Sequence, residues 1–168
     1  MPHVIYATLA LALLGLASLS QHRSELHEQD RAIASQMEAV AQSVAVEIHE
    51  SISVLPFDAV STRDTTALTP EVLFGSTLSG ATFSDATDLD DVHGVTESIS
   101  RTLTDPTTGT VRSIAFTAAA SVQYVRLSGG VLAGSGGTRT FTKEVLVHVS
   151  ASGMTRSIRL PRTYSHSS

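Results

Sequence analysis

Four aspartates within a short stretch are the most concentrated group of potential metal ligands in the sequence. Asp85, Asp88, Asp90 and Asp91 all precede Gly94. Calcium takes about six to eight oxygen ligands from carboxylates, carbonyls and water, and this stretch could supply several of them. The spacing is not that of an EF-hand, because no glycine stands at the sixth position and no glutamate at the twelfth. The sequence therefore predicts a solvated loop of Asx-turns and no cofactor, and calcium bound by these four aspartates is the alternative.

A glycine-rich segment, Ser128 to Thr138, could bind a phosphate group if it had the right neighbours. A phosphate-binding P-loop requires a Lys-Ser or Lys-Thr pair after its last glycine and a helix beyond it. Here Thr138-Arg139 leads into a segment of strand character. The segment is therefore predicted to be a flexible hairpin loop.

The remaining polar residues do not form a recognisable catalytic pattern. The seven histidines are scattered, and no His-Glu-x-x-His motif occurs. Spacing alone does not single out a Ser-His-Asp triad. The sequence therefore predicts a protein that is not an enzyme and that needs no organic cofactor.

The amino-acid composition and the distribution of charge limit which classes of molecule the protein could bind. The chain has 168 residues and a formal net charge of −5, with both signs of charge spread along it. It lacks a basic patch, so we do not expect nucleic acid as a partner. The absence of cysteine excludes disulfides. Asparagine is absent too, which would fit a heat-adapted protein, although chance and codon bias explain it equally well.

The first predicted structural element contains an uncharged, mostly apolar run from Val4 to Leu19. As a helix it would span roughly 24 Å, slightly short for a membrane crossing, which needs about 20 apolar residues. Three interpretations compete. The run could be a secretory signal cleaved before Gln21, a permanent membrane anchor, or an anchor that later becomes the packed core of a polymer.

The following segment, Gln21 to Ser53, contains neither glycine nor proline. Its apolar residues recur at helical spacing and form a single stripe. We therefore expect one continuous helix over about residues 2–54, ending before Pro56, because the residue before a proline disfavours the α conformation. Such a helix is too long to bury its first half against its own domain. The stripe expected to cover a sheet consists of Ile33, Met37, Val40, Val44, Ile48 and Ile52.

The remainder of the chain predicts an antiparallel sheet. Alternating apolar residues mark strands over 95–103, 114–124 and 141–149. Ser152-Gly153 is predicted to be a two-residue turn that pairs Val147 with Ile158 and Val145 with Leu160. The expected fold is therefore α+β, with the second half of the helix packed on a roughly four-stranded antiparallel meander. The sheet side of the core is expected to include Phe116, Val145, Val147 and Ile158.

This order of elements, together with the segment AQSVAVEIHESISVLPFD from Ala41 to Asp58, resembles the type IV pilins and pseudopilins, minor ones in particular. The family usually has a glutamate at the fifth mature residue, where this chain has Ile5. The resemblance implies a structural subunit of an extracellular pilus-like filament. It also implies a helical homopolymer, membrane insertion before assembly, and assembly machinery as a partner. Some pseudopilins bind calcium through aspartate-rich loops, which favours the calcium alternative for Asp85 to Asp91.

On this interpretation the chain divides into four parts. These are a filament-core half of the helix (1–20), an amphipathic half (21–54), a connecting loop region (55–94) and a sheet domain (95–168). The alternatives are a single-pass membrane protein with an extracytoplasmic binding domain, and a secreted module with a cleaved signal peptide. The residues expected to pack in the filament core are Val4, Ile5, Leu9, Leu11, Leu13, Leu14, Leu16 and Leu19.

Overall fold

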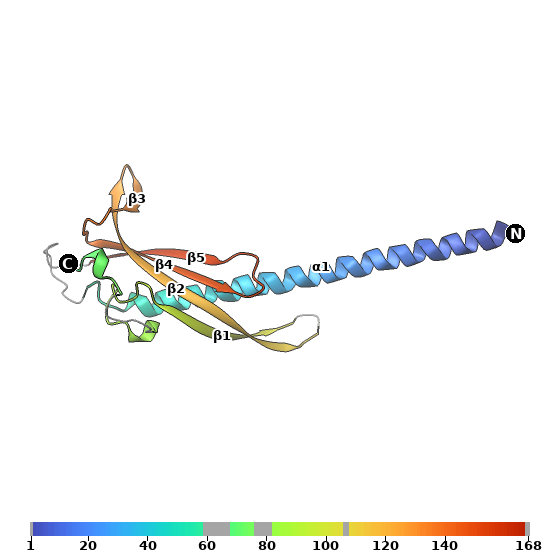
Figure 1. Cartoon of the computed structure of the whole chain (residues 1–168), viewed down its shortest axis with the longest axis horizontal. Helices are drawn as coiled ribbons and strands as arrows, with labels where there is room; N and C mark the ends of the chain where they lie inside the picture. Colours follow the sequence, from blue (N-terminus) through green and yellow to red (C-terminus); the bar gives the residue numbers. More distant parts are fainter. Residues whose placement is uncertain (1, 59–67, 76–81, 106–107, 167–168) are drawn as a thin grey trace.

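A single long helix runs beneath a twisted antiparallel sheet and continues far beyond it (Figure 1). Helix α1 extends over Pro2–Ser53, which confirms the predicted helix. Its end is marked by the N–H of Leu55, which donates to the carbonyl of Ile52 at 3.0 Å, one residue before Pro56. The computed structural model describes residues 2–58, 68–75, 82–105 and 108–166, with side chains from residue 11 onward apart from residue 12.

Five strands form the sheet: β1 (Thr96–Thr104), β2 (Val111–Ser128), β3 (Val131–Gly134), β4 (Thr142–Ala151) and β5 (Ile158–Ser165). The order is β1-β2-β4-β5, all antiparallel, and β3 pairs only with the end of β2. The predicted α+β class and antiparallel sheet are confirmed, but the expected count of four strands is corrected to five.

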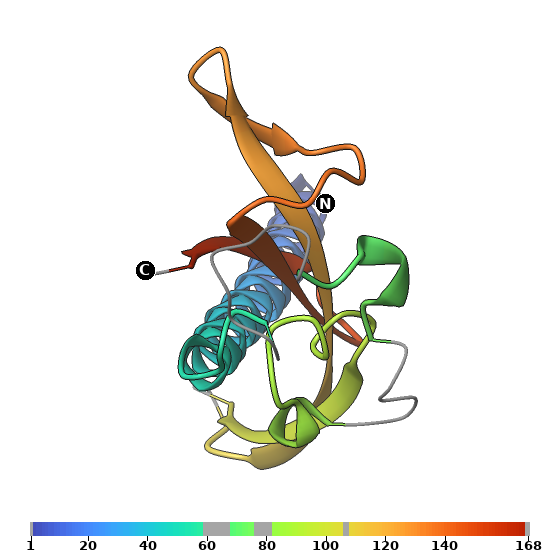
Figure 2. The ribbon, with the colours of Figure 1, turned by 90° about the vertical axis from the view of Figure 1, so that its left-hand side faces the viewer.

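The additional strand lies in the glycine-rich segment that was predicted to be a hairpin loop. Gly129 and Gly130 form its turn with φ angles of 59° and 83°, a left-handed region that glycine adopts without steric cost. Leu127 then pairs with Leu132 across the short ladder. The hairpin of β2 and β3 stands away from the rest of the sheet (Figures 1 and 2).

The register between β4 and β5 differs from the prediction by two residues. Val147 pairs with Leu160 and Val149 with Ile158. The predicted turn does form, since the N–H of Met154 donates to the carbonyl of Ala151 at 3.2 Å, but β5 begins only at Ile158. A shift of two residues leaves every side chain on its expected face, so the hydrophobic pattern could not reveal it.

One face of the sheet and the second half of α1 build the main core. Every second residue of β2 from Phe116 to Tyr124 is buried, as is every second residue of β4 from Lys143 to Val149. Of the predicted helix stripe, Ile33 and Val40 are half-buried; on the sheet side Ile158 is also half-buried. The other predicted core residues are buried, and they are Met37, Val44, Ile48, Ile52, Phe116, Val145 and Val147.

The region between helix and sheet contributes more to the core than a connecting loop would. It contains two short 3-10 helices, η2 (Glu71–Leu73) and η3 (Phe83–Asp85). Gly75 lies so close to His93 that a Cβ there would fall 1.9 Å from the His93 carbonyl oxygen, and its φ is +67°. This tight approach holds the middle of the loop region against its end, where His93 contacts Val122 of β2. Its buried hydrophobic side chains are Phe57, Leu68, Phe74, Phe83, Ala86, Leu89 and Val92.

Candidate functional site

Two of the four aspartates considered as calcium ligands serve as local caps. Asp85 Oδ2 accepts hydrogen bonds from the backbone N–H and the hydroxyl of Thr82, both at 2.8 Å. The backbone donor, followed by the hydroxyl, lowers the pKa of Asp85. Asp91 Oδ2 accepts from the N–H of Thr87 at 3.0 Å and from its hydroxyl at 2.6 Å. Both carboxylates therefore stabilise turns.

The other two aspartates are buried and point to different partners. Asp88 Oδ1 accepts from the backbone N–H groups of Asp90 and Asp91, at 2.9 Å and 3.1 Å. Asp90 turns toward Lys143 on β4. Within the described residues, no three carboxylate, histidine or cysteine side chains gather to hold a metal ion. The four side chains therefore do not converge on one point within the described residues. Asp85, Asp88 and Asp91 accept hydrogen bonds from their own segment, whereas Asp90 faces Lys143.

Lys143 is the centre of a buried polar arrangement between β4 and the loop region. Its side chain is fully buried. Its Nζ lies 2.5 Å from Asp90 Oδ1 and 3.5 Å from Asp58 Oδ2, and it donates to the carbonyl of Phe57 at 2.6 Å. Asp58 and Asp90 are themselves only 2% and 4% exposed. We refer to Asp58, Asp90 and Lys143 as the buried triad.

Aromatic rings enclose the buried triad. Nζ lies 4.2 Å from the ring centre of Phe57, and 5.3 Å from those of Phe74 and Tyr124. These distances suit cation–π attraction, which is stronger where water is excluded. The rings come from the helix exit, the loop region and β2, so the three parts of the chain close over one ammonium group.

The two carboxylates of the buried triad have different surroundings. Asp58 accepts from the N–H of Thr69 at 2.9 Å and from its hydroxyl at 3.1 Å, and such donors favour the ionised form. Apart from Lys143, no donor in the described part of the chain reaches either oxygen of Asp90. Burial outweighs the nearby lysine and raises the pKa of Asp90 to about 7. Burial also raises the pKa of Tyr124, whose hydroxyl donates to the carbonyl of Thr69 at 3.0 Å.

Sequence reasoning did not find the buried triad, although one signal was available. Lys143 is the only lysine in the chain, and the other ten basic residues are arginines. It also stands in phase with Val145, Val147 and Val149, the buried face of β4. A lysine on the inward face of a strand requires a buried partner. No comparable signal marked Asp58 and Asp90, which lie on irregular segments.

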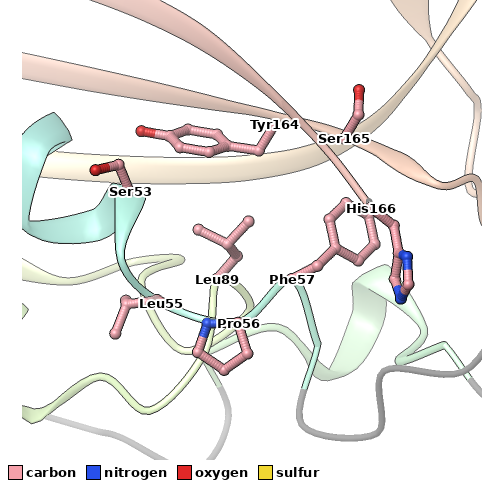
Figure 3. A pocket seen from close by; sticks show the side chains of 8 residues that line it. All are labelled: Ser53, Leu55, Pro56, Phe57, Leu89, Tyr164, Ser165 and His166. Carbon is pink, nitrogen blue, oxygen red and sulfur yellow. The ribbon is translucent and has the colours of Figure 1, made fainter. Parts of the chain in front are cut away.

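A shallow pocket of about 320 Å³ opens beside the triad at the helix exit (Figure 3). The rings of Tyr164, Phe57 and His166 lie around Leu89 and Pro56. The residues that line this pocket include no carboxylate, lysine or arginine. The His166 ring lies at about 70° to the rings of both Phe57 and Phe141, with ring centres 5.7 Å and 5.8 Å apart. The pocket therefore has mixed walls, in which the polar side chains of Ser53, Ser165 and His166 lie beside apolar ones.

The first half of α1 projects from the sheet domain, and its described leucines are exposed (Figure 1). Among the predicted filament-core residues, the side chains of Val4, Ile5 and Leu9 lie outside the described residues. In the part of the chain with described side chains, no helix is both long and apolar enough to cross a membrane. The exposed fractions are 69% for Leu11, 60% for Leu13, 67% for Leu14, 66% for Leu16 and 57% for Leu19.

Comparison with known proteins adds no relative to these observations. No protein-family model, no curated protein and no solved structure matches this chain.

Proposed function

We propose that this chain is a structural subunit of an extracellular, pilin-like filament, in which the projecting halves of α1 from many copies pack together. The observation that carries the proposal is the row of five exposed leucines from Leu11 to Leu19, on a helix half that leaves its own domain. The sheet domain would then form the outer surface of the filament.

Exposed leucines on a projecting helix favour association in water. Burying one leucine side chain contributes roughly 1.5–3 kcal/mol, so five together would contribute on the order of 10 kcal/mol before the cost of ordering the subunits. A helix surrounded by water on all sides cannot recover this free energy from its own domain. Other copies of the same helix can supply the missing contacts.

Small residues among the leucines would allow such helices to approach closely. Gly15 and Ala17 stand between Leu14 and Leu19, and a Cβ at Gly15 would have no neighbouring atom within 4 Å. Glycine costs about 1 kcal/mol relative to alanine inside a helix, so open space at Gly15 gives no reason for it within one chain. Close helix–helix contact in an assembly would explain why a glycine stands at this position.

The test is assembly of the purified full chain after removal of detergent. We expect filaments by electron microscopy and a polymer fraction by sedimentation. The double substitution Leu13→Glu with Leu16→Glu should leave the chain monomeric, because two charges would be buried in the helix bundle. A wild-type chain that stays monomeric contradicts the proposal.

A matched control places the same change on a pair of exposed leucines in the sheet domain. Leu127 and Leu132 face each other on the β2–β3 hairpin, with exposed fractions of 72% and 47%. Leu127→Glu with Leu132→Glu should assemble like the wild type. Loss of assembly in this control, but not in the helix variant, would move the contact surface to the hairpin.

A further inference from the structure

The buried triad places a primary amine against a carboxyl group in a site without water-facing surface. Lys143 Nζ and Asp90 Oδ1 are 2.5 Å apart, and Asp58 Oδ2 is 3.5 Å from the same nitrogen. Three formal charges share this site, where burying each ion is costly unless it is fully paired and hydrogen-bonded. Asp90 lacks such bonds, since Lys143 is its only donor within the described residues.

The choice of lysine at this position has chemical consequences. Arginine usually suits buried carboxylates better, because its planar fork binds them through several fixed hydrogen bonds, and it keeps its proton. This chain uses arginine for every other basic residue and lysine only here. Lysine differs from arginine in that it can lose a proton and act as a nucleophile.

We propose that Lys143 and Asp90 condense to form an intramolecular isopeptide bond between Nζ and Cγ, with release of one water molecule. The close contact of the two groups supplies the proximity that such a reaction needs. The product is a neutral amide in place of two buried charges, so burial favours the product over the ion pair. Its N–H can donate to the carbonyl of Phe57, which Nζ already reaches at 2.6 Å.

The reaction requires no group beyond the buried triad. The reactive form has Nζ as an uncharged amine and Asp90 as a protonated acid, and it differs from the ion pair by one proton moved across their contact. The burial that raises the pKa of Asp90 to about 7 favours this form.

The steps conserve atoms, protons and electron pairs. The lone pair of Nζ attacks Cγ of Asp90 and forms the C–N bond, while the π pair of the C=O bond moves to its oxygen. The carboxylate of Asp58 takes one proton from the nitrogen and gives it to the Asp90 hydroxyl. As the C=O bond re-forms, the C–O bond breaks and this hydroxyl leaves as water. Asp58 returns to a carboxylate.

The bond would join the loop region to the start of β4 and enclose β1, β2 and β3 in a covalent ring. Asp90 lies just before β1, and Lys143 is the second residue of β4. A force applied to α1 would then be transmitted to the central sheet through a covalent bond between the loop region and β4. This proposal concerns the domain interior and does not depend on assembly of the helices.

Peptide mapping of the purified full chain tests the proposal. Trypsin cuts after arginine and lysine, so Asp58 falls in peptide 32–63, Asp90 in peptide 64–101, and a lysine blocked by an amide in peptide 140–156. We expect peptides 64–101 and 140–156 to be joined, with the mass of their sum minus one water molecule. Intact mass should show the same deficit.

Two other results would overturn the proposal. Cleavage after Lys143, seen as the separate peptides 140–143 and 144–156, would mean that the amine is free. A link between peptides 32–63 and 140–156 would mean that Asp58 is the partner. Lys143→Arg is the control for digestion, since trypsin cuts after arginine too and no amide can form.

Asp58→Asn tests the proton transfer separately. It keeps the shape of the side chain but removes the base, so we expect the folded variant to show largely unjoined peptides. Circular dichroism would establish that the variant is folded. A folded Asp58→Asn variant joined to the wild-type extent would contradict the role of Asp58.

Discussion

His49 is a buried histidine held in its neutral form by its surroundings. It is 1% exposed, within the interface between α1 and the sheet. Its Nε2–H donates to the carbonyl of Leu160 at 2.8 Å, which leaves Nδ1 as the acceptor 3.0 Å from the Tyr164 hydroxyl. Burial, the largest cause, and the nearby Arg162 lower the pKa of His49 below 6.5.

This lowered pKa predicts a loss of stability in mild acid. As pH falls through 6.5, His49 binds a proton in the unfolded chain before it does so in the folded one, so the free energy of unfolding decreases. Above that pH the stabilisation is fully present. Asp90, with its pKa raised to about 7, acts in the opposite direction over the same range, so the test is a difference between two proteins. From pH 7.5 to 5.5 the urea unfolding midpoint of the wild type should decrease relative to that of His49→Gln. His22→Gln is the control, because that side chain is 80% exposed and should leave the wild-type slope unchanged.

For single residues, the amino-acid type alone did not predict which side chains would act together. The contacts around each side chain in the folded structure decide this. The four aspartates from Asp85 to Asp91 resembled a calcium site by count alone, yet each carboxylate is oriented by its own neighbours. Lys143 was detectable from its type and its phase on β4. Its partners were not, because contacts between residues distant in sequence depend on how the irregular loop region folds back.

At the scale of elements, the two halves of α1 have opposite surroundings. The second half places Ile48 and Ile52 against the sheet, at 4% and 0% exposed, whereas Leu26 in the projecting part is 54% exposed. The whole element is one helix, but among its described side chains only those of the second half are buried within the chain. The stability of the domain should therefore depend on the second half alone.

Alanine substitutions at one apolar position in each half, Ile52 and Leu26, test this division. Ile52→Ala should lower the free energy of unfolding by about 2–5 kcal/mol, because it removes a buried side chain and leaves a cavity. Leu26→Ala should change it by less than about 0.5 kcal/mol, as is usual for an exposed site. Urea denaturation of both variants measures the difference. Equal losses would mean that the projecting half also stabilises the domain.

Elements with strong periodicity were predictable from sequence, and those without it were not. The spacing of the stripe from Ile33 to Ile52 and the alternation in β2 and β4 predicted the helix, the strands and the faces that meet. The strand β3 was not predicted, because the many glycines around it are typical of loops. The register of β5 was not predicted correctly, because a shift of two residues leaves the partners of Val145 and Val147 on the same face of the sheet.

At the scale of the whole molecule, the chain consists of a compact head and a projecting helix. In the head, the sheet, the second half of α1 and the loop region share one core that encloses the buried triad. The projecting helix adds exposed leucines without adding to that core. Folding of the head and association of the helices are therefore expected to be separable properties.

Removal of residues 1–20 should separate them. The shortened chain begins at Gln21 and keeps every residue of the core, so its unfolding temperature should stay within about 2–4 °C of the full chain, the shift that corresponds to about 1 kcal/mol. It should also remain monomeric, since Leu11 to Leu19 are gone. Calorimetry and sedimentation measure the two properties on the same samples. A large fall in unfolding temperature would place part of the core in the projecting helix, and continued assembly would place the contact surface on the head.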